Sequence, residues 1–227
     1  MKAKTTLLSI PDEYSYKPFA YPTAYNYYEV HENLHWTKRE IELGQDVKDW
    51  NTKASDIDKF LITNILRTFT TNETAVGAGY DTELRIFKPQ EVKMMLRAFA
   101  ARENVHIDAY ALFTDTIGEF DENTFYNEWH QYEVMERKLD YIHKARVKHF
   151  HQYIDMEREK NPDGSEDEVR AKANTEFRRD VARQLAVYGA GTEGILLFSQ
   201  FAILMNYQRQ GMFPGLATIV EWSIRDK

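Results

Sequence analysis

Residues 184–208 read QLAVYGAGTEGILLFSQFAILMNYQ, and this stretch decides the fold. It lies between Arg183 and Arg209, and Glu193 is its only formally charged residue. An apolar stretch of more than about 20 residues is long enough to span a membrane. Polar side chains interrupt this one, however, at Gln184, Glu193, Ser199, Gln200, Asn206 and Gln208. We therefore interpret it as a central helix buried in a bundle and expect no membrane association.

The flanking segments also carry helical patterns. Thr37 and Glu40 have the spacing of a capping box, which predicts a short helix directly after Trp36. A longer helix is predicted from Ser55, with apolar residues at three- and four-residue steps: Ile57, Phe60, Leu61, Ile65 and Phe69. Further helices are predicted at 89–118 and 121–159, and from 216 onward after a turn at 211–215. No segment shows the alternation of a strand, so the predicted fold class is an all-α helical bundle.

Composition excludes several classes of protein. The chain has 227 residues and 43% hydrophobic content, enough for a real core. It has no cysteine, which excludes disulfides, thiolate zinc sites and iron–sulfur clusters, so any metal must bind carboxylates and imidazoles. The formal charge of −7 argues against a nucleic-acid partner. The N-terminus lacks the pattern of a secretory signal, and a cytoplasmic location is expected.

The N-terminal region differs from the rest of the chain. Residues 14–28 read YSYKPFAYPTAYNYY, with two prolines and no clean helical period. We expect residues 1–36 to form an extended, aromatic-rich arm that wraps a helical bundle built from residues 37–227. Arm and bundle together are predicted to form a single domain, 1–227.

Three of the apolar stripes place a carboxylate where another apolar residue belongs. The stripe after Phe69 continues to Glu73, the next helix carries Glu103 and His106, and Glu193 lies in the apolar run. A buried carboxylate is costly unless it is paired, protonated or bound to metal. Glu-x-x-His spacing puts both side chains on one helical face and is typical of di-iron and di-manganese carboxylate bundles. Oxygen ligands with an imidazole suit iron or manganese and poorly suit copper(I).

The chain resembles the small (beta) subunit of class I ribonucleotide reductase over almost its whole length. The matching segments are YPTAYNYYEVHENLHW, LRTFTTNETAVGAGY, FKPQEVKMMLRAFAARENVHIDAY, LAVYGAGTEGILLFSQFAILMN and WSIRD. The resemblance implies a ferritin-like helical fold, usually dimeric. It also implies a dinuclear metal centre, either two iron ions or manganese with iron. This centre uses O2 to oxidise a tyrosine, whose radical passes to a large subunit that reduces ribonucleotides to deoxyribonucleotides.

The resemblance also implies roles for individual residues. Glu73 matches the first metal ligand, which is usually Asp in this family and Glu in some members. Glu103 matches the bridging carboxylate, His106 the imidazole ligand of the first metal, and Glu193 a ligand of the second. The other matches are Tyr110 for the radical tyrosine, Leu197 and Phe201 for its apolar wall, and Trp36 and Asp226 for the radical relay. A buried site that excludes water and reductants is what a phenoxyl radical requires.

The match departs from the family at its end. The family motif continues from Asp226 into Glu-x-x-His, which supplies the last two ligands, whereas Lys227 follows here. Lysine is a poor substitute, because its ammonium must lose a proton before it can bind a metal. A second polypeptide that carries Glu-x-x-His, in a split protein, would complete the site. The chain would otherwise be a shortened form of a longer one, or a noncatalytic relative, in each case without the family's last helices.

Two other function classes remain open. A ferritin-like metal-binding oxidase would use the same ligands without a relay tryptophan or a large subunit. A noncatalytic helical binding module would keep the bundle without the chemistry. We favour the reductase because Trp36, Asp226 and Tyr110 have no purpose in a ferritin. The expected partners are the large subunit, the second polypeptide and a further copy of the chain, in the cytoplasm or, for a viral protein, the host cytoplasm.

Overall fold

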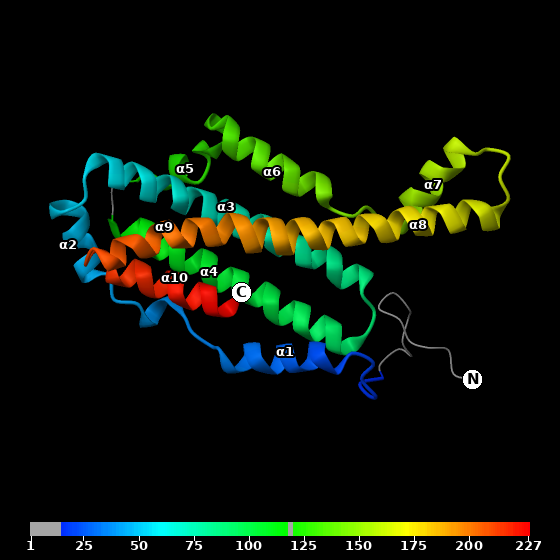
Figure 1. The fold of residues 1–227 in the computed structure, drawn as a ribbon, viewed down its shortest axis with the longest axis horizontal. Coiled ribbons are helices and arrows are strands. Elements are labelled where there is room, and N and C mark those ends of the chain that lie inside the picture. Colours follow the sequence, from blue (N-terminus) through cyan, green and yellow to red (C-terminus); the bar gives the residue numbers. More distant parts are fainter. Residues whose placement is uncertain (1–14, 118–119) are drawn as a thin grey trace.

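The computed structural model describes residues 15–117 and 120–227, and the regular structure in these ranges is helical (Figure 1). Two long helices, α3 (Asp56–Ile86) and α4 (Gln90–Ile117), pair along their lengths. The short link between them makes them antiparallel neighbours. The predicted all-α bundle is confirmed.

Helix α3 begins where the sequence predicts. The Ser55 hydroxyl accepts a hydrogen bond from the Asp58 amide, and the Asp58 carboxylate accepts one from the Ser55 amide. This reciprocal capping box fixes the first turn. The predicted stripe is correct for Ile65, Phe69 and Glu73, which are buried. It is wrong for Ile57 and Phe60, which are 78% and 65% exposed, because no described element covers the first turns of α3 on that side.

A single continuous helix runs from Glu166 to Arg209 and crosses the bundle (Figure 1). It consists of α8 (Glu166–Leu185), the π-helix η3 (Ala186–Leu197) and α9 (Phe198–Arg209). Within η3, the Thr192 hydroxyl donates to the Val187 carbonyl five residues back. π-Helical turns are uncommon and often mark functional sites. Glu193 lies inside this segment.

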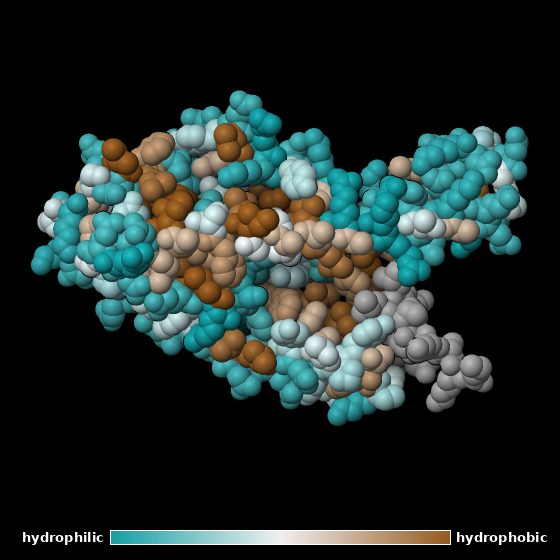
Figure 2. Space-filling model, viewed as in Figure 1, coloured by the Kyte–Doolittle hydropathy of each residue, from teal (hydrophilic) through white to brown (hydrophobic). Residues whose placement is uncertain are grey.

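The prediction that this helix is buried is only partly correct. Leu197, Phe201 and Leu204 are buried, but Ile195 is 72% exposed and Phe198 is 41% exposed. Figure 2 shows apolar side chains gathered on this face of the molecule. The helix packs on the bundle along one side, so its other side has no described partner. This helix is long and apolar enough to span a membrane, a criterion that buried core helices also meet. Its Glu193 side chain faces the bundle interior, where it contacts Lys227.

Helix α10 (Pro214–Asp226) is held at its start by α2 (Gly44–Thr52). The Asp46 carboxylate accepts hydrogen bonds from the Gly215 and Leu216 amides at 2.9 and 2.8 Å. The Asp49 carboxylate accepts one from the amide of Phe213, whose φ of 55° is left-handed. These bonds satisfy amides that have no partner within the helix. They fix where α10 begins and therefore where its last residues lie.

The extended arm is a wrong prediction over much of its length. Residues 22–33 form α1 (Pro22–Asn33), which packs on α4. Pro22 starts this helix, because proline at a first helical position needs no amide partner. Residues 1–14 of the predicted arm lie outside the described residues. The capping box at Thr37 is present and begins the short 3₁₀-helix η1 (Lys38–Glu40) after Trp36.

The predicted helix at 121–159 is also wrong, because the structure divides it into several pieces. These are α5 (Glu122–Phe125), the 3₁₀-helix η2 (Glu128–Gln131), α6 (Glu133–Ala145) and α7 (Phe150–Lys160). A capping box between His149 and Gln152 starts α7 anew after a break. Helix α7 packs on α8 beyond the end of the bundle (Figure 1).

Candidate metal centre

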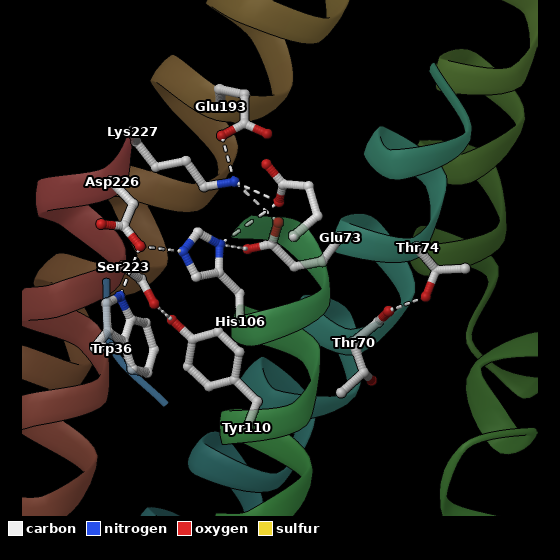
Figure 3. Close-up of polar contacts among 11 residues, drawn as sticks. Trp36, Thr70, Glu73, Thr74, His106, Tyr110, Glu193, Ser223, Asp226 and Lys227 are labelled. Carbon is white, nitrogen blue, oxygen red and sulfur yellow. Dashed lines mark hydrogen bonds and ion pairs between the residues drawn. The ribbon is translucent and has the colours of Figure 1, made fainter. Parts of the chain in front are cut away.

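The predicted site residues come together in the middle of the bundle (Figure 3). Helix α3 supplies Glu73, α4 supplies Glu103, His106 and Tyr110, and η3 supplies Glu193. The end of α10 adds Ser223, Asp226 and Lys227, and Trp36 comes from the segment between α1 and η1. Leu197 and Phe201 lie in the same buried apolar cluster as Tyr110.

Three of the predicted ligands form a compact cluster. Glu73, Glu103 and His106 are buried, and one possible ligand atom from each lies within 4.8 Å of the others. The His106 Nδ1 atom lies 3.5 Å from Glu103 Oε2 and 3.8 Å from Glu73 Oε1. Among the described residues, neither Nδ1 nor Glu73 Oε1 has a hydrogen-bond partner. Two buried polar atoms that converge without a partner fit a cation between them.

Lys227 occupies the other side of this cluster. Its Nζ atom donates to Glu73 Oε2 at 2.9 Å and to Glu103 Oε2 at 2.8 Å, and lies 2.8 Å from Glu193 Oε2. The side chain of Lys227 is 6% exposed. Sequence reasoning treated Lys227 only as a poor ligand and did not predict that its ammonium would lie among the carboxylates. The signal for this contact was its position directly after Asp226.

The pKa values follow from burial and from this crowding of charge. Burial raises the pKa of Glu73 to about 8, despite the nearby Lys227 ammonium. Burial also raises the pKa of Glu193. Burial lowers the pKa of Lys227, but the charges of Glu73, Glu103 and Glu193 outweigh it and raise that pKa well above its usual range. The charged ammonium form of Lys227 is therefore favoured at the centre.

Asp226 connects the cluster to Trp36. Its Oδ2 atom lies 3.1 Å from His106 Nε2 and accepts a hydrogen bond of 2.7 Å from Trp36 Nε1. Burial lowers the pKa of His106, but the hydrogen bond to Asp226 and the nearby carboxylates of Glu103 and Glu73 raise it to about 9. A carboxylate on the far nitrogen of a histidine is the arrangement that orients a metal-binding imidazole. The atom left to bind a metal is Nδ1, which faces the carboxylates.

Tyr110 lies one turn beyond His106 and is fully buried. Its hydroxyl donates to Ser223 Oγ at 3.0 Å, and its ring centroid lies 4.7 Å from that of Phe69. Phe201 contacts Phe69 at 5.1 Å and so forms an outer part of the wall around the ring. Burial and the Glu73 charge raise the pKa of Tyr110. Sequence reasoning missed Ser223, one turn before Asp226, and Phe69, one turn before Glu73.

The dinuclear centre implied by the resemblance fits these residues only in part. On the His106 side, the unpartnered nitrogen and oxygen fit one metal ion. On the Glu193 side, the Lys227 ammonium already lies among the oxygens that a second ion would need.

Comparison with known proteins agrees with this geometry. The family model described as "Ribonucleotide reductase, small chain" matches residues 13–227. The chain belongs to the ribonucleotide reductase small-chain family. It is 38% identical over 213 residues to a protein of Invertebrate iridescent virus 6 named a probable ribonucleoside-diphosphate reductase small subunit. That alignment covers 93% of this chain and 55% of the viral protein, and the chain spans about half the length of the curated small subunits it matches.

Solved structures share the fold of this small chain. The ribonucleotide reductase R2 subunit from Clostridium botulinum superposes with a TM-score of 0.72 at 19% identity, covering 91% of this chain and 57% of that one. An R2-like ligand-binding oxidase from Sulfolobus acidocaldarius gives a TM-score of 0.60 at 19% identity, covering 93% and 73%. The predicted ferritin-like bundle is thereby confirmed.

Proposed function

We propose that this small chain stores an oxidising equivalent as a radical on Tyr110 and passes it to a ribonucleotide reductase large subunit. There the radical would start the reduction of ribonucleotides to deoxyribonucleotides. The observation that carries the proposal is the buried hydrogen-bonded chain from His106 through Asp226 to Trp36, beside a tyrosine that is shielded from solvent.

Tyr110 is suited to hold a radical. Its ring is sealed from water by Phe69 and its neighbours, which protects a phenoxyl radical from reductants. Because burial raises its pKa, the hydroxyl keeps its proton until the ring loses an electron. The hydrogen bond to Ser223 Oγ fixes the orientation of this hydroxyl. Ser223 is in this proposal a positioning residue for the tyrosine hydroxyl.

Trp36 and Asp226 are suited to relay the radical. When the indole loses an electron, its Nε1 proton becomes acidic, and Asp226 Oδ2 lies 2.7 Å away to accept it. The Trp36 ring also lies nearly parallel to the His106 ring, with centroids 5.9 Å apart. Trp36 belongs to the segment between α1 and η1 and is linked to the centre through Asp226.

The proposal includes the residues that would bind the metal ions. Glu73, Glu103, His106 and Glu193 would hold iron, or manganese with iron, and with O2 these ions would supply the oxidising equivalent. A full dinuclear centre needs more ligands than these four. A second polypeptide that carries Glu-x-x-His would supply them. The assembled protein would be a homodimer of this chain or a heteromer, and it would bind the large subunit. The location would be the cytoplasm, or the host cytoplasm for a viral protein.

A ferritin-like metal-binding oxidase is the alternative, supported by the structural likeness to an R2-like ligand-binding oxidase. An oxidase would consume O2 when given iron(II) but would have no use for Trp36. Replacing Trp36 with Phe separates the two functions. It should abolish ribonucleotide reduction with the large subunit if the chain is a reductase component.

Electron paramagnetic resonance tests the central proposal. The chain, with the large subunit and any completing polypeptide, is loaded with iron(II), or with iron(II) and manganese(II), and exposed to O2. We expect a tyrosyl radical that is lost in Tyr110→Phe. Tyr153→Phe is the matched control, because Tyr153 is also buried but donates to Asp180 on α8, away from the centre. A radical that persists in Tyr110→Phe would overturn the assignment.

A further inference from the structure

The Lys227 ammonium has the surroundings of a bound cation rather than of a surface lysine. Its Nζ atom lies 2.8 to 2.9 Å from one oxygen each of Glu73, Glu103 and Glu193. These three carboxylates come from three different helical segments, α3, α4 and η3. Glu73 and Glu103 are buried and the Glu193 side chain is 15% exposed, so their mutual repulsion would be severe without a positive charge among them. The ammonium supplies that charge.

A metal ion cannot share this position. Metal–oxygen bonds to carboxylates are about 2.0 to 2.2 Å long for small divalent ions, so an ion bound by the same three oxygens would overlap the ammonium. The contacts come from the lysine side chain. The side chain reaches the three carboxylates from the end of α10.

The opposite side of the cluster is different. His106 Nδ1 and Glu73 Oε1 are buried, lie 3.8 Å apart, and have no hydrogen-bond partner among the described residues. Asp226 holds the other nitrogen of the same imidazole. An imidazole nitrogen and a carboxylate oxygen that face each other across such a gap suit one divalent ion of the iron or manganese type, which would displace the proton from Nδ1.

We propose that Lys227 is a built-in cation that takes the place of one metal ion between Glu73, Glu103 and Glu193. The centre then has room for one divalent ion, on the His106 side, while the ammonium stays in position. This inference rests on the proposed metal centre and narrows its content from two ions to one. It does not depend on whether Tyr110 stores a radical.

Manganese(II) binding tests the inference. The metal-free 227-residue chain is titrated with Mn²⁺ alone, without O2, and bound metal is measured by EPR of the free ion and by elemental analysis. We expect at most one Mn²⁺ per wild-type chain. Lys227→Glu, which replaces the cation with a fourth carboxylate, should raise the bound metal by one ion. Lys227→Met should bind its first ion roughly tenfold more tightly or better, because a neighbouring positive charge is gone.

Lys227→Arg keeps the charge and is the matched control, with binding expected to stay at the wild-type level. Two tightly bound ions in the wild-type chain, or no gain in either Lys227→Glu or Lys227→Met, would overturn the inference. Tyr110→Phe should bind the same amount of Mn²⁺ as the wild type. A failure of the radical proposal is thus distinguishable from a failure of this one.

A measurement on the wild-type chain covers the case in which a variant does not fold. The Lys227 ammonium, buried and held by carboxylates, should give a slowly exchanging ¹⁵N-detected NMR signal. Titration with diamagnetic Zn²⁺ should shift this signal while preserving it. Loss of the signal as two Zn²⁺ ions bind would show that metal displaces the ammonium, and the inference would be wrong.

Discussion

The contact between Asp226 and His106 offers the sharpest test of the electrostatics at the centre. Asp226 accepts a hydrogen bond from Trp36 and lies 3.1 Å from His106 Nε2. Burial lowers the pKa of His106, and the hydrogen bond to Asp226 is the largest of the effects that raise it to about 9. In the metal-free protein, Asp226→Asn should therefore lower the pKa of His106. The isosteric amide preserves the packing around Trp36.

The raised pKa of His106 makes the free energy of unfolding depend on pH. The pKa of His106 is higher in the folded chain than its ordinary 6.5, so protonation of this imidazole stabilises the fold. That stabilisation is complete below pH 6.5 and is lost as the pH rises through 9. Raising a pKa from 6.5 to about 9 corresponds to about 3 kcal/mol. Wild type should therefore exceed Asp226→Asn in stability by more at pH 6 than at pH 9.5, by less than about 3 kcal/mol, because Glu103 and Glu73 also raise this pKa and remain in the variant.

Urea unfolding at several pH values, with a chelator present, measures this difference, and NMR titration of the histidine rings measures the pKa of His106 directly. Glu73 titrates in the same pH range and interacts with His106, so the unfolding data report the two groups together and the NMR titration isolates His106. Glu136→Gln is the control, because it removes a carboxylate beside the exposed His130. If the difference in unfolding free energy between wild type and Asp226→Asn is the same at pH 6 and pH 9.5, the reasoning fails.

Two further predictions concern the scaffold around the centre. A Cβ atom at Gly79 would lie 2.4 Å from the ring of buried Tyr188, so Gly79→Ala should lower the melting temperature and cost about 1 to 3 kcal/mol. Gly189→Ala, where nothing lies within 4 Å, should be neutral or mildly stabilising, and equal effects of the two changes would contradict the packing argument. Asp46→Ala should cost about 2 kcal/mol in urea unfolding, because two amides at the start of α10 lose their acceptor, whereas Asp46→Asn should retain part of that stability.

Much of the fold could be predicted because many of the helices have start signals and apolar spacing within their own sequence. The capping boxes at Thr37 and Ser55 and the apolar steps at Ile65 and Phe69 depend on neighbouring residues alone. The breaks within 121–159 could not be read in this way. The segments on both sides of each break favour helix, and contacts with distant parts of the chain decide where each piece ends.

The candidate site also has features that the local sequence predicts and features that depend on the folded structure. Glu73, Glu103, His106 and Glu193 were predicted because each interrupts an apolar pattern, and the structure brings all four together. The π-helical geometry around Glu193 was not predictable, since glycine-rich apolar sequence is compatible with either helix type. That the Lys227 ammonium lies among the carboxylates was not predicted, although its position directly after Asp226 indicated that its side chain would lie near the centre.

The hydrogen bonds from Gly215 and Leu216 to Asp46 fix the orientation of α10 at its first turn. At 1.5 Å per residue, Gly215 lies about 16 Å from Asp226. A tilt of the helix axis by about 5° at Gly215 would therefore move Asp226 by about 1.4 Å. That movement is enough to break contacts such as the 2.8 Å one between Lys227 and Glu103. A substitution that loosens the anchoring at α2 is therefore expected to change contacts at the centre through α10, although it touches none of the proposed ligands.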